Sequence, residues 1–181
     1  EHRPGTHLDL REHPEFRERM KAFLGPRNEK RMQCTGPVAL KDRSLLEADI
    51  ANLRAALAAT PRTEGFLNAA SPGVVALFLP NAHYPSHEAY IEALAGALRI
   101  EYEAIAAAGL VLQVDCPDLA MGRHTGFQDL SEAEFLARAE LHVEALNHAL
   151  AKVPADQVRV HICWGNYEGP HDHDIELRRI L

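Results

Sequence analysis

The sequence predicts an α/β fold, and three observations support this prediction. Two short runs rich in branched apolar residues, 110–115 and 158–163, are typical of buried strands. Two longer segments, 86–108 and 132–150, carry apolar residues at helical spacing. Strands and helices alternate along the chain, which indicates parallel strands joined by crossover helices. We therefore expect either a β/α barrel or an open, doubly wound sheet.

The chain begins with a polar N-terminal segment, about 1–30, whose one helical candidate is 14–24. A short extended segment is expected at 31–38, and a helix over 45–59 follows it. Ser44 is the predicted N-cap of this helix, and Glu47 is its capping-box partner. Together these elements predict a first strand-loop-helix unit.

The later helices also carry start and stop signals. Ser71 followed by Pro72 predicts the beginning of a short apolar helix, because serine caps helices and proline suits their first position. Gly109 predicts the end of the helix over 86–108. Ser131 and Glu134 predict a second capping box at the beginning of the helix over 132–150.

The number of strands indicates how complete the fold is. A closed barrel of this kind needs eight strands and typically about 250 residues. We expect about four strands, at 31–38, 65–70, 110–115 and 158–163. Residues 1–181 are therefore expected to form a single domain that is a partial (β/α)8 TIM barrel. Residue 1 is not methionine, and no helix terminator follows Asp174, so we expect the barrel to be truncated at both ends.

Composition excludes several classes of function. A formal net charge of −7 gives no field that would attract nucleic-acid phosphates or an anionic membrane. The sequence has no apolar run that could span a bilayer and no signal peptide at its start. Its three cysteines are widely spaced and odd in number, which favours reduced thiols. We expect a cytoplasmic protein that acts on small molecules.

His161 and Cys163 are the first candidate functional residues. They stand two positions apart at the end of a predicted strand, so both side chains are expected to leave the same face and to reach one metal ion. Imidazole and thiolate are common zinc ligands, and the active site of a β/α barrel lies at the carboxyl ends of its strands. The alternative is a buried cysteine beside a hydrogen-bonded histidine in a core strand.

Asp115 is the second candidate, at the end of the strand 110–115. If Leu112 and Val114 pack under the helices, Gln113 and Asp115 face the barrel interior. An unpaired carboxylate is costly to bury there, so a cationic partner is expected. The alternative role for Asp115 is to cap a helix or close a loop.

The loop at 165–174 carries two further candidates, His171 and His173. They alternate as metal ligands do, but a loop holds ligands less rigidly than a strand, so we favour a solvated loop with Asp174 as a helix N-cap. Isolated cysteines are usually small buried residues, and we assign neither Cys34 nor Cys116 to the metal.

Three ordered motifs in this chain resemble the C-terminal catalytic barrel of cobalamin-independent methionine synthase. The barrel type that this resemblance implies is that of methionine synthase and uroporphyrinogen decarboxylase. The resemblance covers nearly the whole chain and extends to the shorter, single-barrel methionine synthase II-like proteins. The motifs are Cys34-Thr35-Gly36-Pro37-Val38, Leu112-Gln113-Val114-Asp115 with Leu119-Ala120-Met121-Gly122, and His161-Ile162-Cys163-Trp164-Gly165-Asn166-Tyr167.

The resemblance implies a zinc-dependent methyltransferase that needs no cobalamin. Its zinc would be held by His161 and Cys163, with a glutamate and a second cysteine expected beyond residue 181. The methyl group would pass from 5-methyltetrahydrofolate to homocysteine, giving methionine. Asp115 would bind the amino group of the amino-acid substrate. No catalytic residue is assigned within this chain, and the 181 residues alone are expected to be inactive.

Two departures from the family pattern keep alternatives open. The family has a tryptophan that stacks on the pterin shortly after the first motif, whereas this chain continues with 39–42, Ala-Leu-Lys-Asp. The residue after the substrate aspartate is Cys116 rather than an acid. One alternative is a zinc-dependent thiol alkyltransferase resembling epoxyalkane:coenzyme M transferase. The other is a zinc-binding barrel fragment without catalytic activity.

Overall fold

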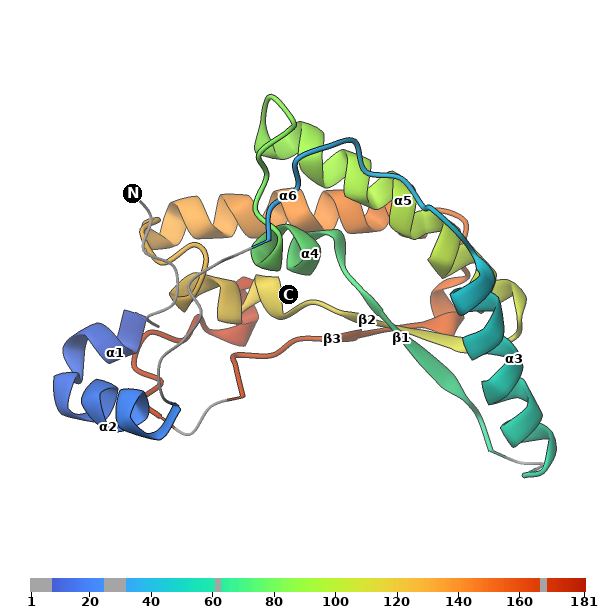
Figure 1. Cartoon of the computed structure of the whole chain (residues 1–181), viewed down its shortest axis with the longest axis horizontal. Helices are drawn as coiled ribbons and strands as arrows, with labels where there is room; N and C mark the ends of the chain where they lie inside the picture. Colours follow the sequence, from blue (N-terminus) through green and yellow to red (C-terminus); the bar gives the residue numbers. More distant parts are fainter. Residues whose placement is uncertain (1–7, 25–31, 61–62, 167–168) are drawn as a thin grey trace.

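The computed structural model describes residues 8–24, 32–60, 63–166 and 169–181. In this part of the chain the fold is mixed α/β, with one three-stranded parallel sheet in the order β1-β2-β3 (Figure 1). The strands are β1 (Phe66–Ala70), β2 (Val111–Asp115) and β3 (Val158–His161). Each strand leads to the next through a helical crossover, as the alternating pattern predicts.

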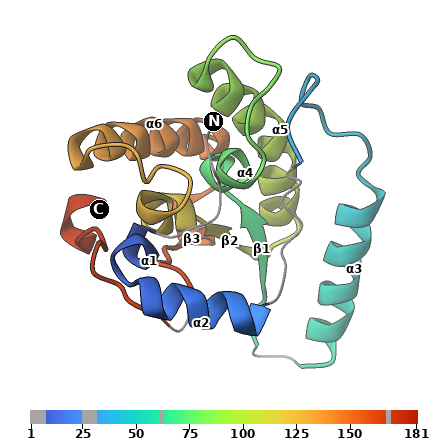
Figure 2. The ribbon, with the colours of Figure 1, turned by 60° about the vertical axis from the view of Figure 1, so that its left-hand side comes forward.

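Six α-helices accompany the sheet in the described ranges. Figures 1 and 2 show α4, α5 and α6 on one side of the sheet and the N-terminal α1 and α2 on the other, near the carboxyl ends of the strands. The helices are α1 (Leu8–Glu12), α2 (Pro14–Leu24), α3 (Ser44–Ala58), α4 (Pro72–Phe78), α5 (His87–Ala107) and α6 (Glu132–Leu150).

Most of the predicted helix boundaries are confirmed. The Ser71 hydroxyl accepts the Val74 N–H at the beginning of α4. The capping box of Ser131 and Glu134 is fully formed at the beginning of α6. Gly109 follows α5 with a φ of +76°, a conformation that glycine adopts without the steric cost of a side chain.

The first predicted unit is only partly correct. Residues 32–38 form no strand; they contribute a single bridge between Cys34 and Asn81, so the described sheet has three strands rather than four. The N-cap of α3 is Arg43 rather than Ser44. Ser44 is the first helical residue, and its hydroxyl donates to the Asp42 carboxylate instead, so its capping box with Glu47 is not formed.

Two predictions near the C-terminal end are also corrected. Strand β3 ends at His161 instead of continuing to 163. The expected helix after Asp174 is only a 3-10 turn, Leu177–Arg179. Of the predicted polar segment and the loop at 165–174, residues 1–7, 25–30, 167 and 168 lie outside the described residues.

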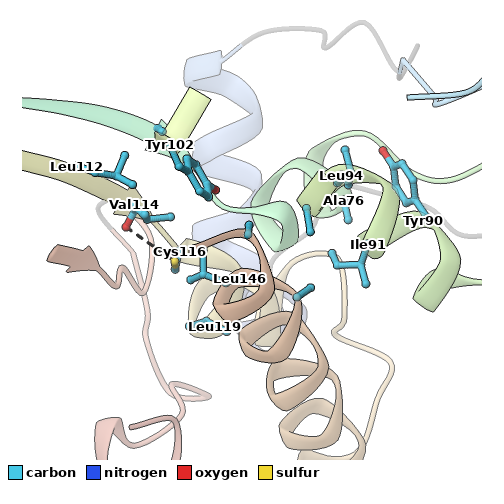
Figure 3. Close-up of a cluster of buried hydrophobic side chains, with 14 of the residues drawn as sticks. Ala76, Tyr90, Ile91, Leu94, Tyr102, Leu112, Val114, Cys116, Leu119 and Leu146 are labelled. Atoms are coloured by element: carbon cyan, nitrogen blue, oxygen red, sulfur yellow. Dashed lines mark hydrogen bonds between the residues drawn. The ribbon is translucent and has the colours of Figure 1, made fainter. Parts of the chain in front are cut away.

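The hydrophobic core lies between the sheet and the helices α4, α5 and α6. Leu112 and Val114 of β2 are 0% exposed, and they share one buried cluster with Tyr102 of α5 and Leu146 of α6 (Figure 3). The Tyr102 hydroxyl donates to the Ala70 carbonyl at 2.5 Å, which ties α5 to the end of β1. One face of the sheet is therefore covered by helices.

Candidate functional site

The face of the sheet that the core leaves open carries polar side chains near the carboxyl ends of the strands. The pairing register aligns Gln113 with Arg159 and, one step further along, Asp115 with His161. The Asp115 and His161 side chains are 34% and 52% exposed. Gln113 and Asp115 thus lie on the face opposite Leu112 and Val114, as the alternation predicts.

A chain of hydrogen bonds joins these four side chains. Arg159 Nε donates to Gln113 Oε1 at 2.8 Å, and Gln113 Nε2 donates to Asp115 Oδ1 at 2.9 Å. The same Asp115 oxygen lies 3.1 Å from His161 Nδ1. Each side chain thereby fixes the orientation of the next, and Asp115 Oδ1 accepts hydrogen bonds from both Gln113 and His161.

The contact with Asp115 selects the tautomer of His161. A carboxylate oxygen only accepts, so Nδ1 of His161 carries the hydrogen in this pair. In the neutral ring, Nε2 is then the nitrogen with the lone pair. Metal-binding histidines are commonly oriented by such a carboxylate, so the arrangement suits a ligand role for Nε2.

Cys163 lies two residues beyond the end of β3 and is partly exposed. Its carbonyl accepts the Met121 N–H at 3.0 Å, and its sulfur accepts the Gly165 N–H at 3.3 Å. Gly165 has a φ of +116°, which favours glycine. The turn at Gly165 therefore directs an N–H at the sulfur and fixes its position.

The predicted metal ligands are thus placed by different means. His161 is fixed by the strand and by Asp115, whereas Cys163 is held by the turn that follows. The sharing of one ion by the two side chains stays a prediction. Among the residues that the structure describes, no three His, Cys, Asp or Glu side chains are grouped so that they could hold a metal ion.

The histidines of the loop after Cys163 are paired with carboxylates. His171 Nδ1 lies 3.2 Å from Asp174 Oδ1, and His173 Nε2 lies 3.0 Å from Glu12 Oε2 of α1. These contacts give both rings a structural role, but Asp174 is not the N-cap that we expected. The loop instead joins the N-terminal helices to the end of β3.

Asp9 of α1 is the residue that anchors this loop. It is 0% exposed, and its Oδ1 accepts the backbone N–H groups of Asp172 and His173 at 2.7 and 2.9 Å. This contact could not be predicted from local sequence, because the partners are more than 160 positions apart. A lone aspartate in a short polar helix has no local pattern that would indicate it.

His124 is buried beside the same loop. Its Nε2 lies 2.8 Å from the Trp164 carbonyl, and its Nδ1 lies 3.6 Å from Asp9 and 3.5 Å from Asp174. Burial lowers the pKa of His124, while the carbonyl and the two carboxylates oppose that shift. Trp164 itself donates from Nε1 to the Ile175 carbonyl, which agrees with a packing role.

A second buried polar network lies within the helix layer. Ser71 Oγ donates to Asp118 Oδ1 at 2.8 Å, and His142 Nδ1 lies 2.8 Å from Asp118 Oδ2. His142 Nε2 in turn lies 2.8 Å from His87 Nε2. Gly73 packs so closely over this network that a Cβ would fall 1.9 Å from Asp118 and 2.4 Å from His142.

This network joins α4, α5, α6 and the turn after β2, so we interpret it as structural. Burial, with the nearby Arg138 and His142, lowers the pKa of His87 to about 4. Neither His87 nor His142 is among the candidate residues identified from the sequence. The sequence does contain a signal for the burial of His142. It lies at helical spacing from Ala139 and Leu146, which are also buried.

The two cysteines not assigned to the metal are both buried. Burial raises the pKa of the Cys116 thiol to about 12, so it remains protonated. The Cys34 thiol donates to the Gly36 carbonyl. These surroundings agree with small packing residues rather than ligands.

Comparison with known proteins adds no assignment: no family model, no curated protein and no solved structure matches this chain. Within the described ranges there is also no helix with the length and apolar character needed to cross a membrane.

Proposed function

We propose that this chain is part of a (β/α)8-barrel enzyme that transfers a methyl group to a thiol at a zinc ion held partly by His161 and Cys163. In this proposal the methyl donor is 5-methyltetrahydrofolate, the thiol is homocysteine, and the protein acts in the cytoplasm. The observation that carries the proposal is the hydrogen bond between His161 Nδ1 and Asp115, at the carboxyl ends of neighbouring parallel strands.

The donor types at this edge fit zinc. Neutral imidazole nitrogen and thiolate sulfur are the ligands that zinc prefers, and each has an orienting hydrogen bond here. A catalytic zinc site uses about three protein ligands and keeps one position open. The proposal therefore requires at least one further ligand from outside the described residues.

Each residue of this chain at the site would have a separate role. A zinc ion held partly by His161 and Cys163 would lower the pKa of the substrate thiol, so that a nucleophilic thiolate would be available near neutral pH. Asp115 Oδ1 keeps Nε2 of His161 available, and the second carboxylate oxygen would accept the substrate ammonium, as the family resemblance implies. The Gly165 N–H would orient the sulfur of Cys163.

The arrangement of the sheet supports a larger barrel. Val160 lies on the helix-facing side of β3, yet it is 50% exposed, and Phe66 of β1 is 44% exposed. Further strands and helices of a barrel would cover such edge residues. A zinc-binding barrel without catalytic activity is the second candidate, because the described residues supply only two ligands.

The test compares Cys163→Ser with the matched variant Cys34→Ser in the complete barrel. Loss of a residue that hydrogen-bonds a metal ligand costs about 10–100-fold in metal affinity, so loss of the ligand itself should cost at least about 100-fold. We expect Cys163→Ser to lose tight zinc binding and thiol methylation, and Cys34→Ser to keep both. Zinc titration and a homocysteine methylation assay measure these properties.

The 181-residue chain should bind zinc weakly and show no turnover. The site assignment is wrong if Cys163→Ser retains activity, or if the short chain holds zinc as tightly as the complete barrel. Tight zinc binding without methylation by the complete barrel would favour the non-catalytic candidate.

A further inference from the structure

The 3-10 helix η2 (Met121–His124) holds the backbone that carries Cys163. The Met121 N–H donates to the Cys163 carbonyl at 3.0 Å. His124 Nε2 lies 2.8 Å from the Trp164 carbonyl, and because a carbonyl only accepts, this nitrogen carries the hydrogen. The first and last residues of η2 therefore bind two consecutive carbonyls of the Cys163 turn, residues 163–165.

His124 lies between this turn and the N-terminal helix α1. It is 0% exposed, and its Nδ1 lies 3.6 Å from Oδ2 of Asp9. Figure 2 shows α1 beside the segment that follows β3, where Oδ1 of Asp9 accepts the N–H groups of Asp172 and His173. Within the described ranges, Oδ2 of Asp9 has no hydrogen bond. A buried polar atom without a hydrogen bond is rare in folded proteins, so its place beside His124 calls for an explanation.

We propose that Asp9 and His124 are positioning residues for Cys163. Asp9 fixes the His124 ring and the loop at 172–173, and His124 fixes the turn that presents the Cys163 sulfur. This inference rests on the proposed function for the role of Cys163. It adds that α1, at the other end of the sequence, belongs to the same site.

Strand pairing does not position Cys163, because β3 ends at His161. A side chain on a loop is held less precisely than one on a strand, whereas a metal ligand has to be placed within about 0.5 Å. The two contacts from η2 replace the missing strand pairing, and Asp9 restricts the ring that makes one of them. The competing explanation is that Trp164 holds the turn by itself, through its packing and its N–H bond to the Ile175 carbonyl.

The experiment uses the full-length natural protein without metal, thiol substrate or methyl donor. Its first measurement is the rate at which iodoacetamide alkylates Cys163, followed by mass spectrometry of the peptides. Cys34 and Cys116 are buried, so their alkylation in the same samples reports unfolding of the whole chain. The second measurement is hydrogen exchange of the Asp172 and His173 amides, which reports whether α1 still holds the loop.

Two substitutions of Asp9 separate its acceptor atoms from its charge. Asp9→Ala removes the acceptor of both N–H groups, so exchange at 172–173 should become at least about tenfold faster. Alkylation of Cys163 should become about 3–10-fold faster, the effect of losing one hydrogen bond. Asp9→Asn keeps a neutral acceptor and should fall between Asp9→Ala and the wild type. Asp49→Ala, on the exposed surface of α3, is the control and should resemble the wild type.

Two substitutions of His124 separate its hydrogen bond from its packing. His124→Gln keeps an N–H group that can reach the Trp164 carbonyl, whereas His124→Met has a similar length and no donor. His124→Met should speed alkylation of Cys163 by about 3–10-fold. His124→Gln should stay within about twofold of the wild type.

The inference is wrong if Asp9→Ala releases the amides at 172–173 and leaves alkylation of Cys163 unchanged, because α1 then anchors the loop alone. It is also wrong if His124→Gln and His124→Met act equally, which would indicate packing. If Asp9→Ala exposes Cys34 and Cys116 as well, the His124 pair decides.

Failure of this inference is distinct from failure of the proposed function. Both measurements are made without zinc and without a methyl donor, so they can show positioning of Cys163 in a protein that transfers no methyl group. Conversely, Cys163→Ser can abolish methylation while Asp9→Ala and the His124 variants leave the alkylation of Cys163 unchanged.

Discussion

The two faces of the same three strands have opposite chemistry. On the face covered by helices, Leu112 and Val114 of β2 are 0% exposed. On the open face, Gln113 and Asp115 of the same strand are partly exposed and bonded to polar neighbours on β3. Successive residues of the strand therefore alternate between packing in the core and forming polar contacts on the open face.

This contrast shows where stability and function reside. Burial of apolar side chains against α5 and α6 supplies most of the free energy that holds the sheet in place. The polar chain on the open face adds little, because partly exposed hydrogen bonds exchange readily with water. Its value lies in fixing Asp115 and His161 relative to each other.

The largest expected effect comes from breaking the covered face. Leu112→Ala should lower the free energy of unfolding by about 2–5 kcal/mol, through lost burial and a residual cavity. Leu45→Ala on α3 is the matched control, since Leu45 is 80% exposed and should cost less than about 0.5 kcal/mol. Urea unfolding measures both, and equal effects would contradict the assignment of the core.

The contrast between the faces could be predicted from sequence for a physical reason. The alternation in 111–115 is local, and so are the caps at Ser71 and Ser131, so short-range pattern was enough. The segment 32–38 was misjudged because its extended residues find only one bridge, at Asn81. Whether a segment pairs depends on its distant partners, and local pattern does not contain them.

The candidate site also has residues that local sequence predicts and contacts that it does not. Asp115 and His161 were identified because each ends a strand, and parallel strands bring such ends together. The contacts of Asp9 with the loop at 172–173 were missed, since they join residues at opposite ends of the sequence. The orientation of Cys163 by Gly165 was also missed, because the left-handed turn follows from the tertiary path.

The polar network beneath the covered face gives the second prediction, which concerns pH. The pKa of His87 is about 4 in the folded chain, against an ordinary 6.5. Between these values the unfolded chain binds a proton that the folded chain does not. The contribution of His87 to stability is therefore complete above about pH 6.5 and is lost as pH falls toward 4.

Urea midpoints from pH 7 to pH 4 test this prediction. His87→Gln should flatten the fall over this window, whatever it does to stability at pH 7. His148→Gln is the control, because His148 is half exposed and pairs with Glu92 on the surface. If the wild type and His87→Gln lose stability in parallel, the helix layer is not the source of the acid sensitivity.

The smallest expected effect comes from Gln113, whose neighbour on the same strand, Val114, lies on the covered face. Gln113→Leu places an apolar side chain on the open face, and the groups that it releases on Asp115 and Arg159 remain accessible to water. The free energy of unfolding of the 181-residue chain should therefore change by less than about 0.5 kcal/mol. Val114→Thr makes the converse change on the covered face, with little change of shape. Burying its hydroxyl should cost about 1–3 kcal/mol.

Urea unfolding of the two variants compares the faces directly. If Gln113→Leu destabilises the chain as much as Val114→Thr, the hydrogen-bonded chain from Arg159 to His161 is itself a structural element. The open face would then contribute to stability as the covered face does.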